Sequence, residues 1–130
     1  MKKARKKKTP KEKLWDEAYN TFRVYIRGRD TNFQGYAVDP SDGKTYPVNE
    51  MQLGHFRHGK GKECYFWESN AHMQHTNNNY FGGQTVLQRY TAFVIRKYGM
   101  EEFERIDKAK RIYWSNELLE EVIKKYKDLV

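Results

Sequence analysis

Two short stretches decide how this chain is interpreted: Gly54-His55-Phe56 and, further along, residues 70–79, which read Asn-Ala-His-Met-Gln-His-Thr-Asn-Asn-Asn. All four histidines lie within 21 consecutive positions that begin in the first stretch and end in the second, and three asparagines follow after one intervening residue. Neutral imidazole can take a proton from water near pH 7, and amide oxygens suit hard cations such as Mg²⁺ or Mn²⁺. The pattern indicates a base facing a metal, the pair that phosphodiester hydrolysis needs.

Within these stretches, His55 and Asn79 are the leading functional candidates. If His75 and Asn79 sit on one helix they share a face, because they are four residues apart. His72 fits a packed histidine equally well, and Asn77, Asn78 and His58 favour structural or solvated roles. The loop that follows the first stretch has two glycines and four side chains suited to phosphate contact, namely Arg57, His58, Lys60 and Lys62.

The segment before the first stretch has strand character. Tyr36–Val38 and Thr45–Val48 are short β-prone runs on either side of residues 39–43, Asp-Pro-Ser-Asp-Gly, which is a turn sequence. We expect a hairpin whose return strand continues to His55. The apolar run Cys64–Trp67 predicts another short strand.

Helices are predicted towards both ends of the chain. Residues 9–12, Thr-Pro-Lys-Glu, are typical of a helix start with Thr9 as N-cap, and an apolar stripe follows to about Gly28. Apolar positions between residues 86 and 94 predict a helix that ends at Gly99, a suitable C-terminal glycine. A short helix is expected around residues 103–106, and Ser115 caps a last amphipathic helix.

Length and composition fit one domain with a tail. A chain of 130 residues, 38% of them hydrophobic, buries one core, so we expect residues 10–130 to form a single α+β domain and residues 1–9 a disordered basic arm. The single cysteine, Cys64, excludes an intrachain disulfide and a four-thiolate zinc site. The sequence has neither a long apolar run nor a signal peptide, which predicts a cytoplasmic protein with no membrane partner.

The net charge of +8 is concentrated at the N-terminus. Residues 1–13 hold eight basic residues and one acidic residue, whereas the rest of the chain is close to neutral. A basic arm attracts polyanions, since each phosphate that it neutralises releases counterions. Nucleic acid is therefore the expected partner, with Lys6, Lys7 and Lys8 as contacts. The charge alone also allows a solubilising tail, RNA or an anionic membrane.

The order of the motifs resembles the NinG/Rap family of phage recombination proteins. Arg29-Asp30 follows a helix, then come Gly54-His55-Phe56 and residues 70–79, where the family has N-x-H-x-Q-C-x-x-C-N. The resemblance continues through Gly83, Tyr90 and Tyr98-Gly99 and covers about residues 14–128. Such proteins are similar to HNH and endonuclease VII-type enzymes. This implies a ββα-metal (His-Me finger) core after an N-terminal helix and a small hairpin, with helices following it, in a phage- or prophage-encoded protein of the bacterial cytoplasm.

The resemblance also implies roles for individual residues. His55 would be the general base, Asn79 a ligand of a divalent metal, Mg²⁺ or Mn²⁺, and Asn70 a brace that bonds to the backbone. The wider HNH pattern has an acid or histidine directly before the base, where Gly54 stands in this chain. Asp30 is our candidate for the missing ligand and His75 a further one. Other acids, at positions 39, 42 and 50, are alternatives.

One departure from the family concerns its zinc knuckle. That motif would use a Cys-x-x-Cys pair near Phe33 and Tyr36 and a second pair at positions 75 and 78, and this chain has none of these cysteines. We therefore expect no structural zinc. Packing of Phe33 with Tyr36 is the expected substitute.

The leading functional hypothesis is a metal-dependent DNA endonuclease that acts on branched or junction DNA in phage recombination. Its main competitor is a catalytically inactive DNA-binding protein of the same fold. A third reading, an RNA-binding accessory protein, is allowed by the basic tail alone. The sequence is also compatible with a homodimer.

Overall fold

The computed structural model describes residues 6–130, so the first five residues of the expected basic arm lie outside the described part. The described chain divides into two compact units. One contains the residues up to Tyr25 together with Trp114–Val130, and the other contains Ile26–Tyr113. Helices and two small antiparallel hairpins make the fold α+β, as the sequence predicted.

Helix α1 (Pro10–Asp30) begins where the sequence predicted. Thr9 Oγ1 accepts a hydrogen bond from the Glu12 N–H at 3.1 Å and donates to the Glu12 carboxylate at 3.2 Å, so side chains satisfy the first turn. The helix continues two residues past the predicted end at Gly28. Beyond it, the N–H and the hydroxyl of Thr31 both donate to the Arg27 carbonyl.

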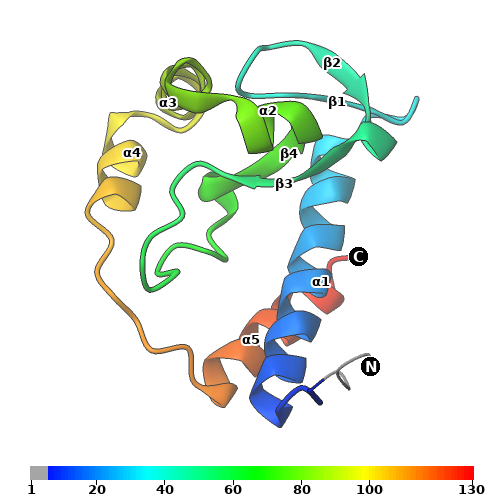
Figure 1. Cartoon of the computed structure of the whole chain (residues 1–130), viewed down its shortest axis with the longest axis vertical. Coiled ribbons are helices and arrows are strands. Elements are labelled where there is room, and N and C mark those ends of the chain that lie inside the picture. Colours follow the sequence, from blue (N-terminus) through cyan, green and yellow to red (C-terminus); the bar gives the residue numbers. More distant parts are fainter. Residues whose placement is uncertain (1–5) are drawn as a thin grey trace, which may run out of the picture. The chain divides into compact units, whose positions relative to one another are not determined.

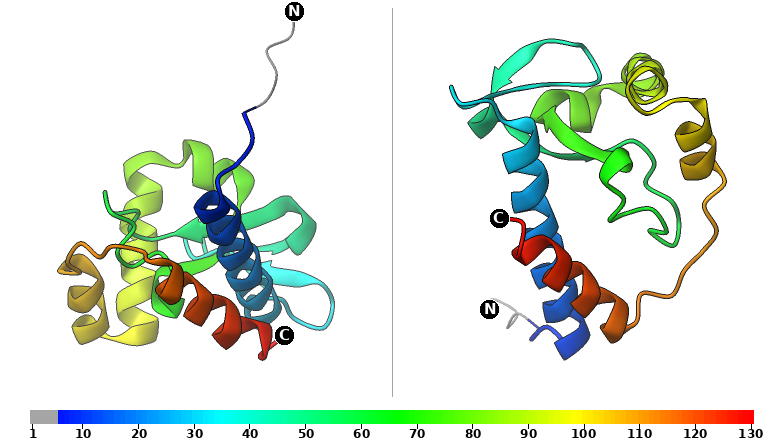
Figure 2. Two further views of the ribbon diagram at one scale, coloured as in Figure 1. Left: turned by 90° about the horizontal axis from the view of Figure 1, so that it is seen from below. Right: turned by 180° about the vertical axis from the view of Figure 1, so that it is seen from behind.

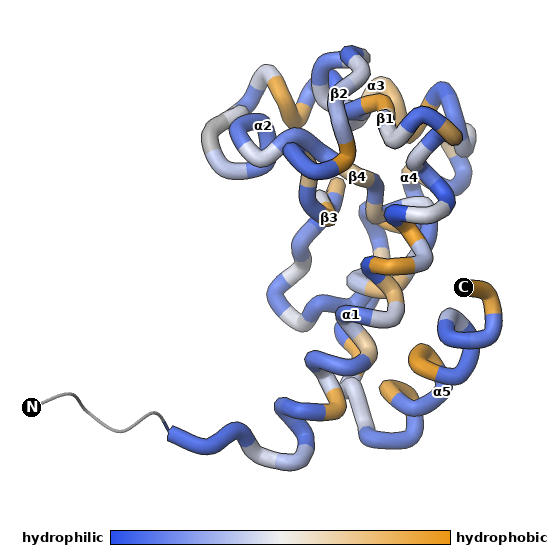
Figure 3. The backbone as a smooth tube through the Cα atoms, turned by 90° about the vertical axis from the view of Figure 1, so that its right-hand side faces the viewer, coloured by the Kyte–Doolittle hydropathy of each residue, from blue (hydrophilic) through white to orange (hydrophobic). Residues whose placement is uncertain are grey.

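Helix α5 (Asn116–Lys127) provides the second half of the first unit. Ser115 caps it as predicted, because its hydroxyl accepts the N–H of the residue three positions on at 3.2 Å. Leu119 and Tyr126 are buried in this unit with Ala18 and Phe22, and the Phe22 and Tyr126 rings meet edge to face with centroids 5.0 Å apart. Apolar and polar segments alternate along α5 (Figure 3), as an amphipathic helix requires.

In the second unit, β1 (Tyr36–Val38) and β2 (Thr45–Pro47) form the predicted hairpin. The expectation that its return strand continues to His55 is wrong. Pro47 has no N–H to donate and stands at the end of the ladder, and the 3-10 turn η1 (Val48–Glu50) then redirects the chain. The strand that follows therefore has a different partner.

Strand β3 (Met51–His55) pairs antiparallel with β4 (Ala71–His75) in a second, separate hairpin, and the two strands lie side by side in Figure 1. Helix α2 (Thr76–Phe81) follows β4 directly and contacts both strands. Two strands followed by a helix is the ββα order that the resemblance implied.

Residues 56–70, which join β3 to β4 and are all described, contain no strand, so the strand predicted at Cys64–Trp67 is wrong. This run forms turns, in which the Trp67 N–H donates to the Cys64 carbonyl at 3.2 Å, and the 3-10 turn η2 (Glu68–Asn70) follows. Cys64 and Phe66 are buried. The apolar character of the run therefore reflects contact with the core and not membership of a sheet.

Helix α3 (Gly83–Tyr98) ends at Gly99 as predicted, where a φ of 93° favours glycine and the N–H donates to the Ile95 carbonyl at 2.9 Å. Helix α4 (Met100–Asp107) then turns back beside α3 (Figure 2). One buried apolar cluster of this unit consists of Cys64, Tyr90, Val94 and Ile106. Across residues 6–130, we find no helix with the length and apolarity to cross a membrane.

Candidate functional site

The β3–β4 hairpin places His55 at the end of β3, next to the loop that joins the strands. Antiparallel partners share a face, so His55, opposite Ala71, lies on the same face as Met51 and its partner His75. His55 and His75 stand at opposite ends of that face, about 13 Å apart along the strands at the usual rise per residue. The hairpin therefore does not bring these two histidines together.

Burial and one hydrogen bond define the state of the His55 ring. Its Nε2 lies 3.0 Å from the backbone oxygen of Tyr65, and because a carbonyl only accepts, Nε2 carries the proton and Nδ1 does not. The Tyr65 ring stacks on the imidazole with centroids 4.1 Å apart. Only 8% of His55 is exposed, and this burial, with the charges of His58 and Lys62, lowers its pKa to about 4. The ring is neutral at pH 7 and can accept a proton at Nδ1.

Asn70 is fully buried beneath the loop that leads to Tyr65. Its Nδ2 donates to the carbonyls of Arg57 at 2.8 Å and Cys64 at 3.0 Å, and its Oδ1 accepts the Arg57 N–H at 2.8 Å. The amide thus ties residue 57 to residue 64. It shapes the loop that presents the Tyr65 carbonyl to His55.

A chain of hydrogen bonds holds the residue before His55. The Tyr90 hydroxyl donates to the Gly54 carbonyl at 2.9 Å. Because its one proton is used there, it accepts from His72 Nδ1 at 3.0 Å, and His72 Nε2 in turn accepts from the Tyr98 hydroxyl at 2.7 Å. Burial lowers the pKa of His72 to about 2. His72 is therefore a neutral, packed histidine that helps to position the end of β3.

Gly54 has no room for a side chain. A Cβ at this position would lie 2.2 Å from Gln74 Oε1 and 2.8 Å from Gln74 Cβ. The acid or histidine that the wider HNH pattern places directly before the base would therefore displace Gln74. The glycine at this position follows from the packing of the hairpin.

Of the four side chains predicted to face phosphate, three are exposed and one forms hydrogen bonds within the protein. His58, Lys60 and Lys62 are exposed, and the His58 ring centroid is 6.1 Å from that of His55. Arg57 is half-buried and donates to the Ile106 carbonyl at 2.7 Å and to the Glu63 carboxylate at 3.1 Å. Its guanidinium anchors the loop to the end of α4, so contact with DNA would require it to leave these partners.

The described part of the basic arm is exposed. Lys6, Lys7 and Lys8 all have exposed side chains, and Lys8 forms an ion pair with Asp16 of α1. Residues 1–5 of the expected arm lie outside the described part of the chain.

The three predicted metal ligands lie in different settings. Asn79 is half-buried on α2, and among residues 6–130 its amide has no hydrogen-bond partner. The Asp30 carboxylate accepts from Arg29 at 2.8 Å and from the Met73 N–H of β4 at 2.9 Å. His75 caps α2, with Nδ1 accepting the backbone N–H two residues on at 3.2 Å. The described residues include no cluster of three or more His, Cys, Asp or Glu side chains placed to hold a metal.

A polar cluster joins the β1–β2 turn to the end of β4 and the start of α2. Asn78 Nδ2 donates to Asp39 at 2.8 Å and to Asp42 at 2.9 Å, and the His75 N–H donates to Asp39 at 2.8 Å. The Tyr46 hydroxyl also donates to Asp42, and the Tyr46 and His75 rings lie 4.5 Å apart. We call Asp39, Asp42, His75 and Asn78 the Asp–Asn cluster.

The Asp–Asn cluster corrects the expected substitute for the zinc knuckle. Phe33 is 97% exposed and Tyr36 is 41% exposed, so the predicted buried aromatic pair does not form. The residues that meet positions 75 and 78 are Asp39 and Asp42, whose i, i+3 spacing equals that of a Cys-x-x-Cys pair. Structural zinc sites use cysteine and histidine. In this cluster, by contrast, the carboxylate oxygens accept hydrogen bonds from amide and backbone N–H groups. The residues present do not fit a zinc ion.

Sequence reasoning missed several residues of the site. Tyr65 acts through its backbone oxygen, and Tyr90 and Tyr98 act through their hydroxyl groups. The partners of these atoms are brought next to them by folding, and no local sequence pattern signals such contacts. Asp39 and Asp42 were expected only as alternative metal ligands, although a signal for their contact with positions 75 and 78 was available. Their spacing matches that of His75 and Asn78, although within a turn sequence it is easily read as turn chemistry alone.

Fold and site together define a small α+β protein with a neutral, anchored histidine on a ββα motif. A family model described as Bacteriophage Lambda NinG protein matches residues 1–130. The chain therefore belongs to the NinG family, and this membership indicates a protein related to phage recombination. No match was found among curated proteins or among solved structures.

Proposed function

We propose that the protein is a metal-dependent DNA endonuclease that cuts branched or junction DNA in phage recombination. The observation that carries the proposal is the His55 ring, which is neutral, anchored through Nε2 to Tyr65, and unprotonated at Nδ1. NinG membership supports recombination as the setting. The exposed His58, Lys60 and Lys62, on the loop that follows His55, suit a phosphate backbone.

In the proposed reaction, His55 Nδ1 takes a proton from a water molecule while the water oxygen attacks the phosphorus of a phosphodiester. The bond from phosphorus to the leaving oxygen breaks, and that oxygen takes a proton from solvent. The products are a phosphate monoester and a hydroxyl. The Tyr65 carbonyl supports the step because its hydrogen bond to Nε2–H strengthens when the ring becomes positively charged.

A bound divalent metal, Mg²⁺ or Mn²⁺, would supply charge neutralisation at the phosphate and at the leaving oxygen. Asn79 suits such an ion because it offers a hard amide oxygen that has no hydrogen-bond partner within residues 6–130. Mg²⁺ usually keeps several waters and takes further ligands from substrate phosphates, so one protein oxygen can suffice. The roles of Asp30 and His75 as further ligands stay predictions, since both already accept hydrogen bonds from the protein.

Cleavage assays test the proposal directly. The protein is incubated with a four-way junction, a flap and a linear duplex, each with Mg²⁺, Mn²⁺ or EDTA. We expect metal-dependent cutting that His55→Ala abolishes and that His58→Ala, the exposed neighbour, retains at saturating DNA. Asn79→Ala should raise the metal concentration needed, whereas Asn77→Ala on the same helix should not. Binding without cutting in every metal would support the inactive DNA-binding protein instead.

We also propose that the Asp–Asn cluster replaces the family's zinc knuckle without a metal. Support comes from the Asn78 amide, which bridges both aspartates and so links the β1–β2 turn to α2 as a shared ion would. Metal analysis of the purified protein is the test. Zinc bound in a one-to-one ratio would refute this part of the proposal.

A further inference from the structure

An apolar strip of β1 and the turn before it is open to solvent. Phe33 is 97% exposed, Val38 is 53% exposed and Tyr36 is 41% exposed, whereas Ala37 between the last two is buried. Tyr36 and Val38 therefore point to the same side of the strand. We call Phe33, Tyr36 and Val38 the β1 strip. Exposure of this much aromatic surface on a small unit is typical of a contact site.

The turn holds Phe33 in place. Asn32 Oδ1 accepts the N–H groups of Gln34 at 2.9 Å and Tyr36 at 3.1 Å, and the Asn32 N–H donates to the Tyr36 carbonyl at 2.8 Å. Gly35 completes the turn with a φ of 85°. Because the backbone on both sides of Phe33 is hydrogen-bonded, little backbone entropy is lost when a ligand stacks on its ring.

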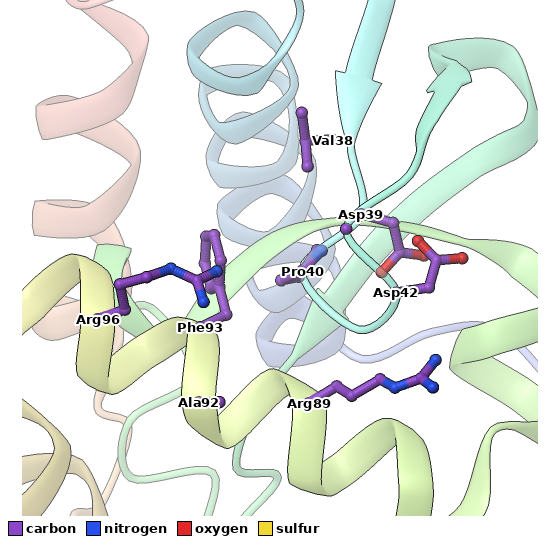
Figure 4. A pocket seen from close by; sticks show the side chains of 9 residues that line it. Val38, Asp39, Pro40, Asp42, Arg89, Ala92, Phe93 and Arg96 are labelled. Atoms are coloured by element: carbon purple, nitrogen blue, oxygen red, sulfur yellow. The ribbon is translucent and has the colours of Figure 1, made fainter.

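The β1 strip leads into a cavity. Val38 also lines a hollow of about 360 Å³ between the β1–β2 turn and α3, whose apolar lining includes Pro40 and Phe93 (Figure 4). Arg89 and Arg96 line it from α3, and both extend their side chains towards the turn (Figure 4). A cavity of this size is at the small end of ligand pockets and has room for one nucleotide.

The two arginines are available to a ligand. Both are exposed, and within the described chain, residues 6–130, neither guanidinium has a hydrogen-bond or ion-pair partner. Helix α3 contains no acidic residue. The carboxylates across the cavity, Asp39 and Asp42, are engaged by donors of the Asp–Asn cluster and of their own turn. An anionic group at the rim therefore finds unpaired cations, while the floor between them is apolar.

We propose that the β1 strip and the α3 cavity together bind an unpaired strand of DNA. Bases stack on Phe33 and Tyr36, one nucleotide enters the cavity against Pro40 and Phe93, and its phosphates pair with Arg89 and Arg96. Exposed aromatic rings combined with arginines bind single strands in this way, because every unstacked base offers a flat face and every linkage a charge. In a duplex the base faces are already stacked, so this surface selects the unpaired part of a branched substrate.

This inference rests on the proposed function for the identity of the polymer, and it adds the part of the substrate that the surface recognises. Stacking of a base on an aromatic ring contributes enough that its loss weakens binding roughly five- to hundredfold per base. The test uses a fluorescein-labelled oligothymidine of about 12 nucleotides, within the usual size of single-strand sites, and measures fluorescence anisotropy.

We expect Phe33→Ala to weaken binding of the oligothymidine about tenfold or more, and Phe33→Trp to retain it, because indole also stacks. Arg89→Ala combined with Arg96→Ala should weaken binding and flatten its salt dependence by about 1.4 in log–log slope, the value for two phosphates on a single strand. The matched controls are Tyr113→Ala, an aromatic residue that is 76% exposed, and Lys108→Ala, a lysine whose side chain is 74% exposed. Both controls should bind like the wild type.

Equal affinities for Phe33→Ala and Tyr113→Ala would overturn the proposal and would favour a protein partner for the β1 strip. The proposal would also be overturned if the wild-type protein bound duplex DNA as tightly as oligothymidine. His55→Ala separates this inference from the proposed nuclease activity, since that variant should bind oligothymidine normally. If no DNA is cut under any condition but oligothymidine binding still depends on Phe33, the nuclease proposal fails and this one stands.

Discussion

Replacement of Asn78 by alanine tests the Asp–Asn cluster most directly. The Asn78 amide donates two hydrogen bonds to carboxylates, at 2.8 Å to Asp39 and at 2.9 Å to Asp42. A hydrogen bond to a charged acceptor contributes about 1.5 to 3 kcal/mol, and Asp39 is fully buried, so water cannot replace the lost donor there. Asp39 keeps its bonds from Ser41 and from the His75 N–H.

From these contacts we expect Asn78→Ala to lower the free energy of unfolding by about 3 kcal/mol. That is a large part of the 5 to 15 kcal/mol typical of a folded domain. The matched control is Asn77→Ala, an exposed asparagine on the same helix whose side chain makes no hydrogen bond among the described residues. Both substitutions raise helix propensity by a similar amount, so the difference between them isolates the cluster.

The assay is urea denaturation at pH 7, followed by far-ultraviolet circular dichroism, with and without EDTA. Asn77→Ala should stay within about 0.5 kcal/mol of the wild type, as exposed substitutions usually do. The reasoning is refuted if Asn78→Ala is no less stable than Asn77→Ala. It is also refuted if zinc is bound in a one-to-one ratio and its removal by EDTA lowers the wild-type midpoint, because zinc would then be stabilising this unit.

Three further predictions concern the surroundings of His55. Burial lowers the pKa of His55 to about 4 and of His72 to about 2, below the unfolded value near 6.5, so the unfolded state binds protons first as the pH falls. The free energy of unfolding should be steady above pH 7 and about 3 to 4 kcal/mol lower at pH 5, as measured by denaturation at each pH; a flat profile would contradict the burial of both rings. Arg57→Met should lower the free energy of unfolding by about 3 kcal/mol, because it leaves the buried Glu63 carboxylate without its cation. An unchanged urea midpoint together with weaker DNA binding would instead support the predicted contact of Arg57 with phosphate. Tyr90→Phe should cost about 2 kcal/mol, because the carbonyl next to His55 and the His72 N–H both lose a buried partner, and a thermal melt indistinguishable from the wild type would count against the hydrogen-bond chain.

Helix boundaries were the part of the fold most visible in the sequence. Thr9, Gly99 and Ser115 each act through atoms within five residues along the chain, so their capping could be predicted without knowing what packs against the helix. The β1–β2 hairpin was predictable for the same reason, since its turn residues are local. The family, too, was visible in the order of the motifs.

Strand partners, by contrast, depended on the tertiary structure. β3 follows β2 closely in the sequence, yet it pairs with β4, which begins 16 residues after His55 and directly after Asn70. A short apolar run such as Cys64–Trp67 also has the same sequence pattern whether it forms a strand or a buried turn. Pairing and burial are set by contacts between distant residues, and neither is encoded in local periodicity.

The properties of Gly54-His55-Phe56 and of residues 70–79 divide in the same way between sequence and tertiary structure. The sequence by itself identified His55 and Asn79 as candidates, because residue type and motif order suffice to suggest a base and a hard ligand. Only the tertiary structure decided that Nε2 of His55 is the anchored nitrogen, that His72 supports Gly54 through Tyr90, and that Asp39 and Asp42 meet Asn78. A proton's position and a carboxylate's partner are set by atoms within about 3 Å, and the chain brings such atoms together only by folding.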